Sequence, residues 1–259
     1  MKFAVAVVVA VALLPLVAPY EPAAQDRDHP FAAPGAAHWL GTDEFGRDQF
    51  SRLLYGGRVS LFAGVFATAL TLAAGLALGG LAGYFGGVMD EIIMRGAELF
   101  LSMPWLYLLL GVRAFLPLSL GPLHSFLLIT AIIGLLGWAR PARLVRGLVL
   151  SGRELPYVLA ARGFGAGPWY LFRRHLLPLL WPVLRTQAVV LTPRYVLAEV
   201  SLSFLGLGVG EPIPSWGQQI ATLRQLAALE AHPWAGLGPA LILLTLFTLV
   251  HVPNRTKQV

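Results

Sequence analysis

Cysteine is absent from the 259-residue chain, and charged residues make up only 12% of it. The lack of cysteine excludes disulfides, thiolate metal sites and a cysteine nucleophile. Soluble domains carry roughly 25% charged residues and about 45–50% apolar ones, whereas 57% of this chain is hydrophobic and its mean hydropathy is +0.70. One soluble core cannot bury so much apolar surface, so the composition indicates an integral membrane protein.

Sequence motifs typical of catalysis are missing as well. The chain has no phosphate-binding loop of the G-x-x-x-x-G-K-[ST] kind, no H-E-x-x-H motif and no G-x-S-x-G motif. We therefore predict that it is not an enzyme and holds no catalytic, cofactor-binding or metal-ligating residues. The net charge of +6 would also fit a nucleic-acid-binding protein. The arginines, however, cluster between apolar segments, which favours a membrane loop and no nucleic-acid partner.

Six apolar segments approach or exceed the length of roughly 20 residues that a membrane-spanning helix needs. They are expected at residues 3–20, 60–84, 99–116, 123–138, 179–198 and 233–252. The first also fits a cleavable signal peptide, because Lys2 precedes a short apolar run. An uncleaved span agrees better with the topology of the later segments. We predict an all-α, polytopic fold with six transmembrane helices.

The distribution of arginine gives these spans an orientation. Seven arginines lie between the fourth and fifth segments, at Arg140, Arg143, Arg146, Arg153, Arg162, Arg173 and Arg174. A single acidic residue, Glu154, accompanies them. Because positively charged loops face the cytoplasm, this loop is placed inside, and six spans then place both termini inside too.

The basic loop contains a short helical pattern. Tyr157, Ala160, Ala161 and Phe164 follow the i, i+3, i+4, i+7 spacing and share one helix face, which begins just after Pro156. Small residues between two aromatic anchors fit a groove on a partner protein. An amphipathic loop lying on the membrane surface fits the same pattern, and periodicity alone leaves both interpretations open.

Turn-forming residues mark several helix boundaries. Asp48 or Ser51 is expected to cap a short helix that leads inward, and Gly86-Gly87 to break the second span. Gly163 to Gly167 permit a sharp turn in the basic loop, after which Pro168 opens a second short helix.

Glycines at every fourth position line one face of the second span. Gly75, Gly79 and Gly83 would let another backbone approach closely. We expect this face to pack against a helix of the same chain rather than to form a dimer contact.

Three charged residues fall within the predicted spans, where charges are costly unless paired or hydrated. Arg194 and Glu199 are five residues apart, about 140° around an ideal helix, so they lie on different faces. Arg113 is expected to reach the outer membrane interface, with a functional role in a pathway through the membrane as the weaker alternative. For Glu199 we predict a structural role, with Arg113 as its candidate partner.

The basic loop resembles the "EAA" loop of bacterial ABC importer permeases. The matching positions are Ala160, Ala161, Gly165 and Pro178, and His175 fits a form common in the peptide-transport branch. Leu159 stands where the family has glutamate, and Glu154 lies five residues too early to replace it. This departure puts the strength of coupling to an ATPase in doubt.

Three further stretches are similar to the C-type subunit of dipeptide, oligopeptide and nickel permeases. They lie at residues 40–56, 83–95 and 199–217 and follow the family's order. The resemblance covers roughly residues 38–250, and it implies a first helix and extracytoplasmic segment at 1–58 followed by a permease core at 59–259. Within that core, residues 141–178 would form the cytoplasmic coupling loop.

The resemblance implies a mechanism and a set of partners. Two permease subunits, expected to be a heterodimer, would form the path in a bacterial inner membrane. Each subunit would lay its loop helix into one of two ATP-binding subunits, which bind the ATP, while an extracytoplasmic binding protein delivers substrate. The expected ATPase contacts are Tyr157, Ala160, Ala161, Gly163, Phe164 and Gly165.

Two other classes of function fit part of the sequence. A membrane scaffold that recruits a cytoplasmic partner without transport is the alternative, and an intramembrane enzyme is poorly supported by the missing motifs. Di- or oligopeptides are the expected substrate, although nickel importers share these motifs and no residue identifies the substrate.

Overall fold

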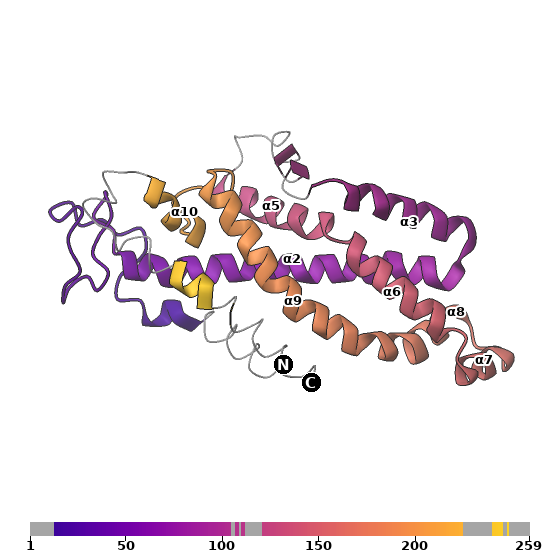
Figure 1. Cartoon of the computed structure of the whole chain (residues 1–259). Coiled ribbons are helices and arrows are strands. Elements are labelled where there is room, and N and C mark those ends of the chain that lie inside the picture. Colours follow the sequence, from indigo (N-terminus) through magenta and orange to yellow (C-terminus); the bar gives the residue numbers. More distant parts are fainter. Residues whose placement is uncertain are drawn as a thin grey trace. The chain divides into compact units, whose positions relative to one another are not determined.

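The computed structural model describes residues 13–104, 107–108, 110–111, 121–224, 240–245 and 248 (Figure 1). Among these residues the regular structure is helical, apart from one isolated antiparallel bridge between Thr42 and Asp48. The predicted all-α fold is confirmed for the described part of the chain.

Helix α2 spans Gln49–Phe85 and is the first long helix. Asp48 caps its amino terminus, because its Oδ2 accepts a hydrogen bond of 2.7 Å from the backbone N–H of Ser51. The helix ends where Gly86 and Gly87 adopt positive φ angles of 68° and 57°, a conformation that glycine reaches without strain. The predicted cap and helix break are confirmed, but the helix begins well before residue 60.

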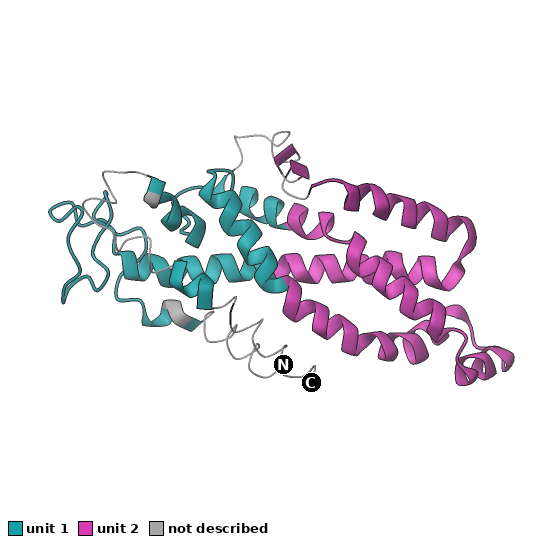
Figure 2. Ribbon diagram, in the orientation of Figure 1, with its two compact units in different colours: residues 1–65, 117–130, 192–259 teal, residues 66–116, 131–191 magenta. Residues whose placement is uncertain are grey.

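The chain divides into two compact units (Figure 2). Unit 1 comprises residues 1–65, 117–130 and 192–259, and unit 2 comprises residues 66–116 and 131–191. Three helices contribute residues to both units: α2, α5 (Pro122–Leu136) and α9 (Leu177–Phe204).

Within the described residues, two helices are long and apolar enough to cross a membrane: α2 and the continuous stretch Pro168–Phe204. A third span results if α5 and α6 (Ala139–Gly152), which bend by 41°, count as one. The spans predicted at 3–20, 99–116 and 233–252 fall only partly within the described residues.

In unit 2, the glycine face of α2 packs closely against α6. A Cβ atom at Gly79 would lie 2.3 Å from the carbonyl oxygen of Ala142, and one at Gly75 would lie 2.6 Å from Pro141 Cβ. Only glycine allows this approach, so the predicted packing within the chain is confirmed.

A second contact joins α6 to α3 (Gly87–Ser102), which carries the polar residues after α2. The guanidinium of Arg146 forms a two-pronged ion pair with the carboxylate of Asp90. Paired donors and acceptors in this geometry fix the orientation of the two side chains, so α3 is held against α6 near its first turn.

The core of unit 2 joins α6 to the start of α9. Its buried apolar residues are Val145, Val149, Leu176, Leu180 and Leu184. The last three follow the helical spacing i, i+4, i+8, which places them on one face. This cluster ties the end of the basic loop to α6.

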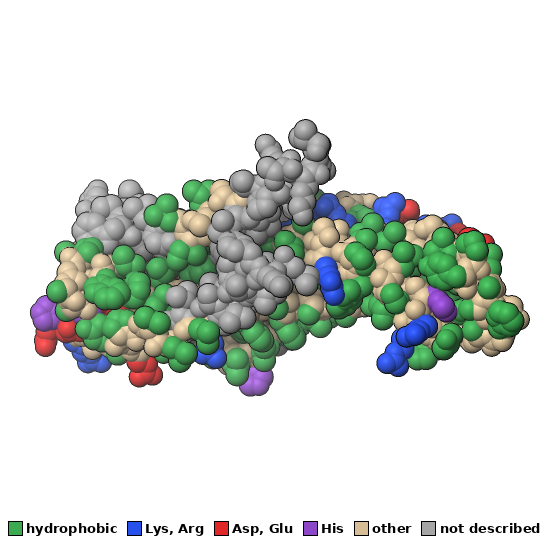
Figure 3. All heavy atoms as spheres, turned by 90° about the horizontal axis from the view of Figure 1, so that it is seen from below, with side chains coloured by type: hydrophobic (Ala, Val, Ile, Leu, Met, Phe, Trp, Pro, Cys, Tyr) green, Lys and Arg blue, Asp and Glu red, His purple; other side chains and the backbone are tan. Residues whose placement is uncertain are grey.

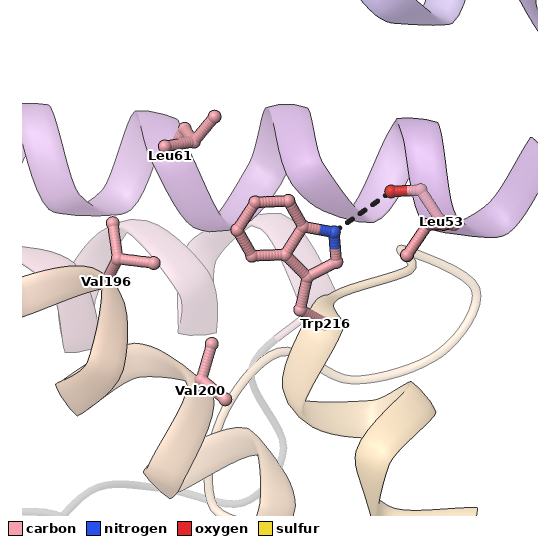
Figure 4. Close-up of a cluster of buried hydrophobic side chains, with 5 residues drawn as sticks. All are labelled: Leu53, Leu61, Val196, Val200 and Trp216. Atoms are coloured by element: carbon pink, nitrogen blue, oxygen red, sulfur yellow. Dashed lines mark hydrogen bonds between the residues drawn. The ribbon is translucent and has the colours of Figure 1, made fainter. Parts of the chain in front are cut away.

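Unit 1 is organised around Trp216, which opens the short helix α10 (Trp216–Ala221) and is 1% exposed. Figure 4 shows its ring between α2 and α9, surrounded by Leu53, Leu61, Val196 and Val200. The indole Nε1 donates a hydrogen bond of 3.0 Å to the carbonyl oxygen of Leu53, so the one polar atom of the ring is satisfied.

Large apolar side chains are also exposed on the surface. Figure 3 shows hydrophobic side chains over much of one face of the molecule. Examples with half or more of their area exposed are Phe62, Phe85 and Leu241. Exposed apolar area of this extent marks contact with lipid or with another protein.

Candidate functional site

The first part of the basic loop forms α6, and residues 154–178 form two short helices, as predicted. Helix α7 spans Pro156–Gly163 and helix α8 spans Pro168–Leu171, each with proline in its first turn. Residues 172–176 then form a π-helical turn that leads directly into α9. The loop is therefore an ordered part of unit 2.

Helix α7 presents most of its side chains to the outside. Tyr157 is 50% exposed, Leu159 is 44% exposed and Phe164, at the end of the helix, is 92% exposed. Ala160 and Gly163 are exposed as well. An aromatic side chain as exposed as Phe164 gains nothing from folding in this chain alone, which is a physical reason to expect a partner surface.

One residue of α7 is fully buried. Val158 is 0% exposed, between the exposed Tyr157 and Leu159. Leu171 and Leu176, which follow in the chain, are each 1% exposed, and the ring centroids of Tyr157 and His175 lie 5.8 Å apart. The buried Val158 and this ring contact anchor α7 in unit 2 while most of its side chains stay exposed.

The turn after α7 explains the glycine in the sequence pattern. The Ala166 N–H bonds to the carbonyl of Ala161, and the Gly165 N–H bonds to that of Arg162, at 3.1 and 3.0 Å. These two bonds, with Gly165 at φ 84°, form a Schellman motif that closes the helix. Ala161 itself is half-buried.

Two arginine side chains, one at the end of α6 and one in α7, contact the carboxyl end of α2. Arg153 Nη1 donates to the carbonyl oxygens of Gly83 and Tyr84, at 3.1 and 3.4 Å. The guanidinium of Arg162 lies over the Tyr84 ring, 5.9 Å from its centroid. Cations are favourable at this end of a helix, where unpaired carbonyls concentrate negative charge.

Glu199 lies in a buried polar cluster of unit 1. Its side chain is 2% exposed, and Ser203 Oγ donates to its Oε1 at 2.6 Å. Ser60 and Ser215 belong to the same cluster, and each accepts a backbone N–H, from Trp216 and Gln218 respectively. The bond from Trp216 to Ser60 joins α10 to α2 beside Glu199 on α9.

The other two charges predicted within spans differ from Glu199. Arg194 is exposed on α9, away from the buried carboxylate of Glu199. Arg113 lies outside the described residues, so its pairing with Glu199 stays a prediction.

Sequence reasoning missed a charged network near the start of α2. Arg47 Nε pairs with Asp43 Oδ2 at 2.7 Å, and Glu211 bridges Arg47 and Arg52 at 2.9 and 3.0 Å. These residues line a pocket of about 290 Å³ in unit 1. Asp43 and Glu211 are 168 positions apart in the chain, so only the family-like stretches at 40–56 and 199–217 could have linked them.

The described helices include some that are long and apolar enough to span a bilayer, and glycines let them pack closely. These features are those of an all-helical, polytopic membrane protein. Residues 75–254 match the family model described as "Binding-protein-dependent transport system inner membrane component". The chain belongs to this family. It is therefore a multi-pass inner-membrane permease component of a binding-protein-dependent ABC transporter, and it is not the ATPase.

The curated relatives agree with this assignment. A dipeptide transport system permease protein, DppC, of Bacillus subtilis is 38% identical over 87% of this chain and 68% of its own length. The oligopeptide permease OppC of the same organism is 37% identical over 83% of this chain and 68% of its own. The nickel permease NikC of Escherichia coli is 39% identical over 88% and 83%. The predicted C-type resemblance is confirmed, and transport systems of this kind work with an ATPase and a binding protein.

Proposed function

We propose that this permease subunit imports di- or oligopeptides and couples to its ATPase through the outer face of α7. The observation that carries the coupling assignment is the exposure of Tyr157, Ala160 and Phe164 on one ordered helix. Apolar and aromatic residues held rigidly in the open fit the helix-in-groove mode of recognition. In this proposal, Gly163 and Gly165 let the partner approach the end of the helix.

The proposed arrangement has six spans with both termini in the cytoplasm, so that the arginine-rich loop faces the ATPase. Pairing with a second, different permease subunit would complete the path, and two ATP-binding subunits would sit beneath the pair. ATP is bound by those subunits, and this chain needs no cofactor of its own. Closure of the ATPase pair would then move the two α7 helices together and switch the open side of the path.

Peptide transport is proposed because the dipeptide and oligopeptide permeases are similar along most of the chain. Nickel is the second candidate, because a nickel permease is equally similar. ATP-dependent uptake into vesicles that contain the assembled transporter and its binding protein distinguishes the two. Uptake of a labelled dipeptide supports the proposal, and uptake of Ni²⁺ without dipeptide contradicts it.

A pair of variants tests the coupling surface. Ala160→Arg places a long charged side chain in the middle of the open face of α7. We expect the ATPase subunits to be lost on purification through a tag on this chain. Ser151→Arg, also exposed but at the end of α6, is the matched control and should retain them. Retention by both variants would contradict docking through α7 and favour a scaffold that binds its partner elsewhere.

A further inference from the structure

An apolar groove of about 580 Å³ lies in unit 2, at the end of α2 and the start of α8. It is within the usual size range of ligand pockets. Its lining includes Ala73, Ala77, Gly80, Tyr84, Trp169 and Phe172. Nothing in the coupling role described above uses this groove.

The groove leaves large aromatic surface uncovered. Trp169 is 73% exposed and Phe85 is 60% exposed, and both line the groove. The small residues Ala73 and Ala77 are exposed one turn apart on α2, which opens a shallow track along the helix. Small residues of this kind admit either an apolar chain or a second helix, and the charge at one end of the groove distinguishes between them.

Positively charged side chains lie at the end of the groove that is lined by Tyr84. The guanidinium of Arg162 lies 5.9 Å from the centre of the Tyr84 ring, and Arg153 is bonded to the Tyr84 carbonyl. Arg153 has Glu154 beside it at 3.1 Å, whereas no carboxylate within the described residues forms an ion pair with Arg162. The rim therefore carries an uncompensated cation, which an apolar partner helix would leave unpaired.

An apolar track with a cation at one end matches a lipid with a negatively charged headgroup. We propose that an anionic phospholipid of the cytoplasmic leaflet binds here, with an acyl chain along Ala73 and Ala77 and its phosphate at Arg162. The inference rests on the proposed topology, which puts this end of α2 at the cytoplasmic surface. Anionic lipids there attract basic segments close to the membrane.

This site would link the membrane to the coupling helix. Arg162 lies in the last turn of α7, one residue away from Ala161 of the proposed ATPase contact. A bound phosphate would hold this turn against the end of α2. The lipid would thus steady the loop in the position from which it meets the ATPase.

Native mass spectrometry of the purified, assembled transporter tests the site. The probes are phosphatidylglycerol, phosphatidylethanolamine with the same acyl chains, and glycerol 3-phosphate as the headgroup alone. We expect phosphatidylglycerol to bind more tightly than phosphatidylethanolamine, and glycerol 3-phosphate not to bind. Arg162→Gln should weaken phosphatidylglycerol binding about fivefold, since one arginine near an anionic surface contributes about that factor. Ala77→Phe should fill the track and abolish binding.

Two matched variants control for charge and bulk. Arg143→Gln removes an exposed arginine of α6, and Ala69→Phe enlarges an exposed alanine of α2; neither residue lines the groove. Both should bind phosphatidylglycerol as the unaltered chain does. The proposal would be overturned if the two phospholipids bound equally well or if Ala77→Phe retained binding. It would also be overturned if the assembled transporter bound no phosphatidylglycerol because its second subunit covers the groove.

The measurement uses neither ATP nor a transported substrate. A failure of peptide uptake would therefore leave the lipid result unchanged. Conversely, loss of lipid binding would leave the uptake assignment intact.

Discussion

Gly165 ends α7 in a left-handed conformation, with φ at 84°. A Cβ at this position would meet no atom within 4 Å, so the requirement for glycine comes from the backbone and not from crowding. An L-residue in that conformation is strained by about 1–2 kcal/mol. The family's glycine is therefore explained within this chain, before any partner is considered.

Gly165→Ala should consequently weaken the turn without blocking the outer face of α7. We expect ATP hydrolysis by the assembled transporter to become less dependent on substrate-loaded binding protein, while the complex still purifies intact. Gly147→Ala is the control, because Gly147 is helical, has open space around its Cβ position and lies outside the proposed ATPase contact. If both variants lose stimulation equally, backbone strain at Gly165 is not the cause.

Glu199 shows which properties of a single residue could be predicted from the sequence and which could not. The sequence predicted a structural role for this charge, and its burial beside Ser203 agrees with that role. The sequence did not predict the contributions of Ser60 and Ser215, because hydroxyls from distant elements leave no spacing pattern. Single serines are common, and only the fold brings these three to one carboxylate.

At the level of elements, helix α2 was predicted from its charge-free segment and therefore too short. Its first turns carry polar side chains such as Gln49, Ser51 and Arg52, which are all buried. Tertiary ion pairs and the Asp48 cap stabilise helix in a stretch whose polarity resembles a loop. Hydropathy measures how favourably a residue transfers from water into an apolar phase. It does not account for polar residues whose hydrogen bonds and ion pairs are formed with other parts of the protein.

The α2–α6 contact can be tested through the glycine face. Gly79→Val would place side-chain atoms against the backbone of Ala142, and overpacking of this kind costs about 1–3 kcal/mol. We expect a lower thermal unfolding midpoint for the purified complex in detergent. Gly147→Val on α6 introduces the same side chain where no atom lies within 4 Å of the Cβ. A similar loss in both variants would point to helix propensity instead of packing.

For the whole molecule, the sequence was sufficient to predict an all-helical membrane permease, and the family match confirms it. The number of spans was a harder problem, since it depends on segments near the length limit, such as residues 123–138. In the structure this stretch becomes α5, bent by 41° against α6. Length and hydropathy do not register such a bend, which is why the six-span arrangement stays a proposal.

Leu159 provides a test of coupling in the assembled transporter. It is 44% exposed on α7 and occupies the position of the family's glutamate. Leu159→Glu should increase the stimulation of ATP hydrolysis by substrate, by up to about fivefold, which is the range of an exposed ion pair. Leu159→Gln, similar in size but uncharged, should not. An equal gain in both variants would show that polarity, rather than an ion pair with the ATPase, is responsible.

The Schellman turn and the buried Val158 have a consequence for the assembly of the transporter. Because α7 is closed by its own backbone bonds and carries the fully buried Val158, it does not have to fold as a partner arrives. The entropy cost of ordering this helix is met when the permease folds and not when the partner binds. Under the proposed docking, a newly inserted permease would present a preformed helix, so ATPase subunits could bind and dissociate without refolding of the membrane part.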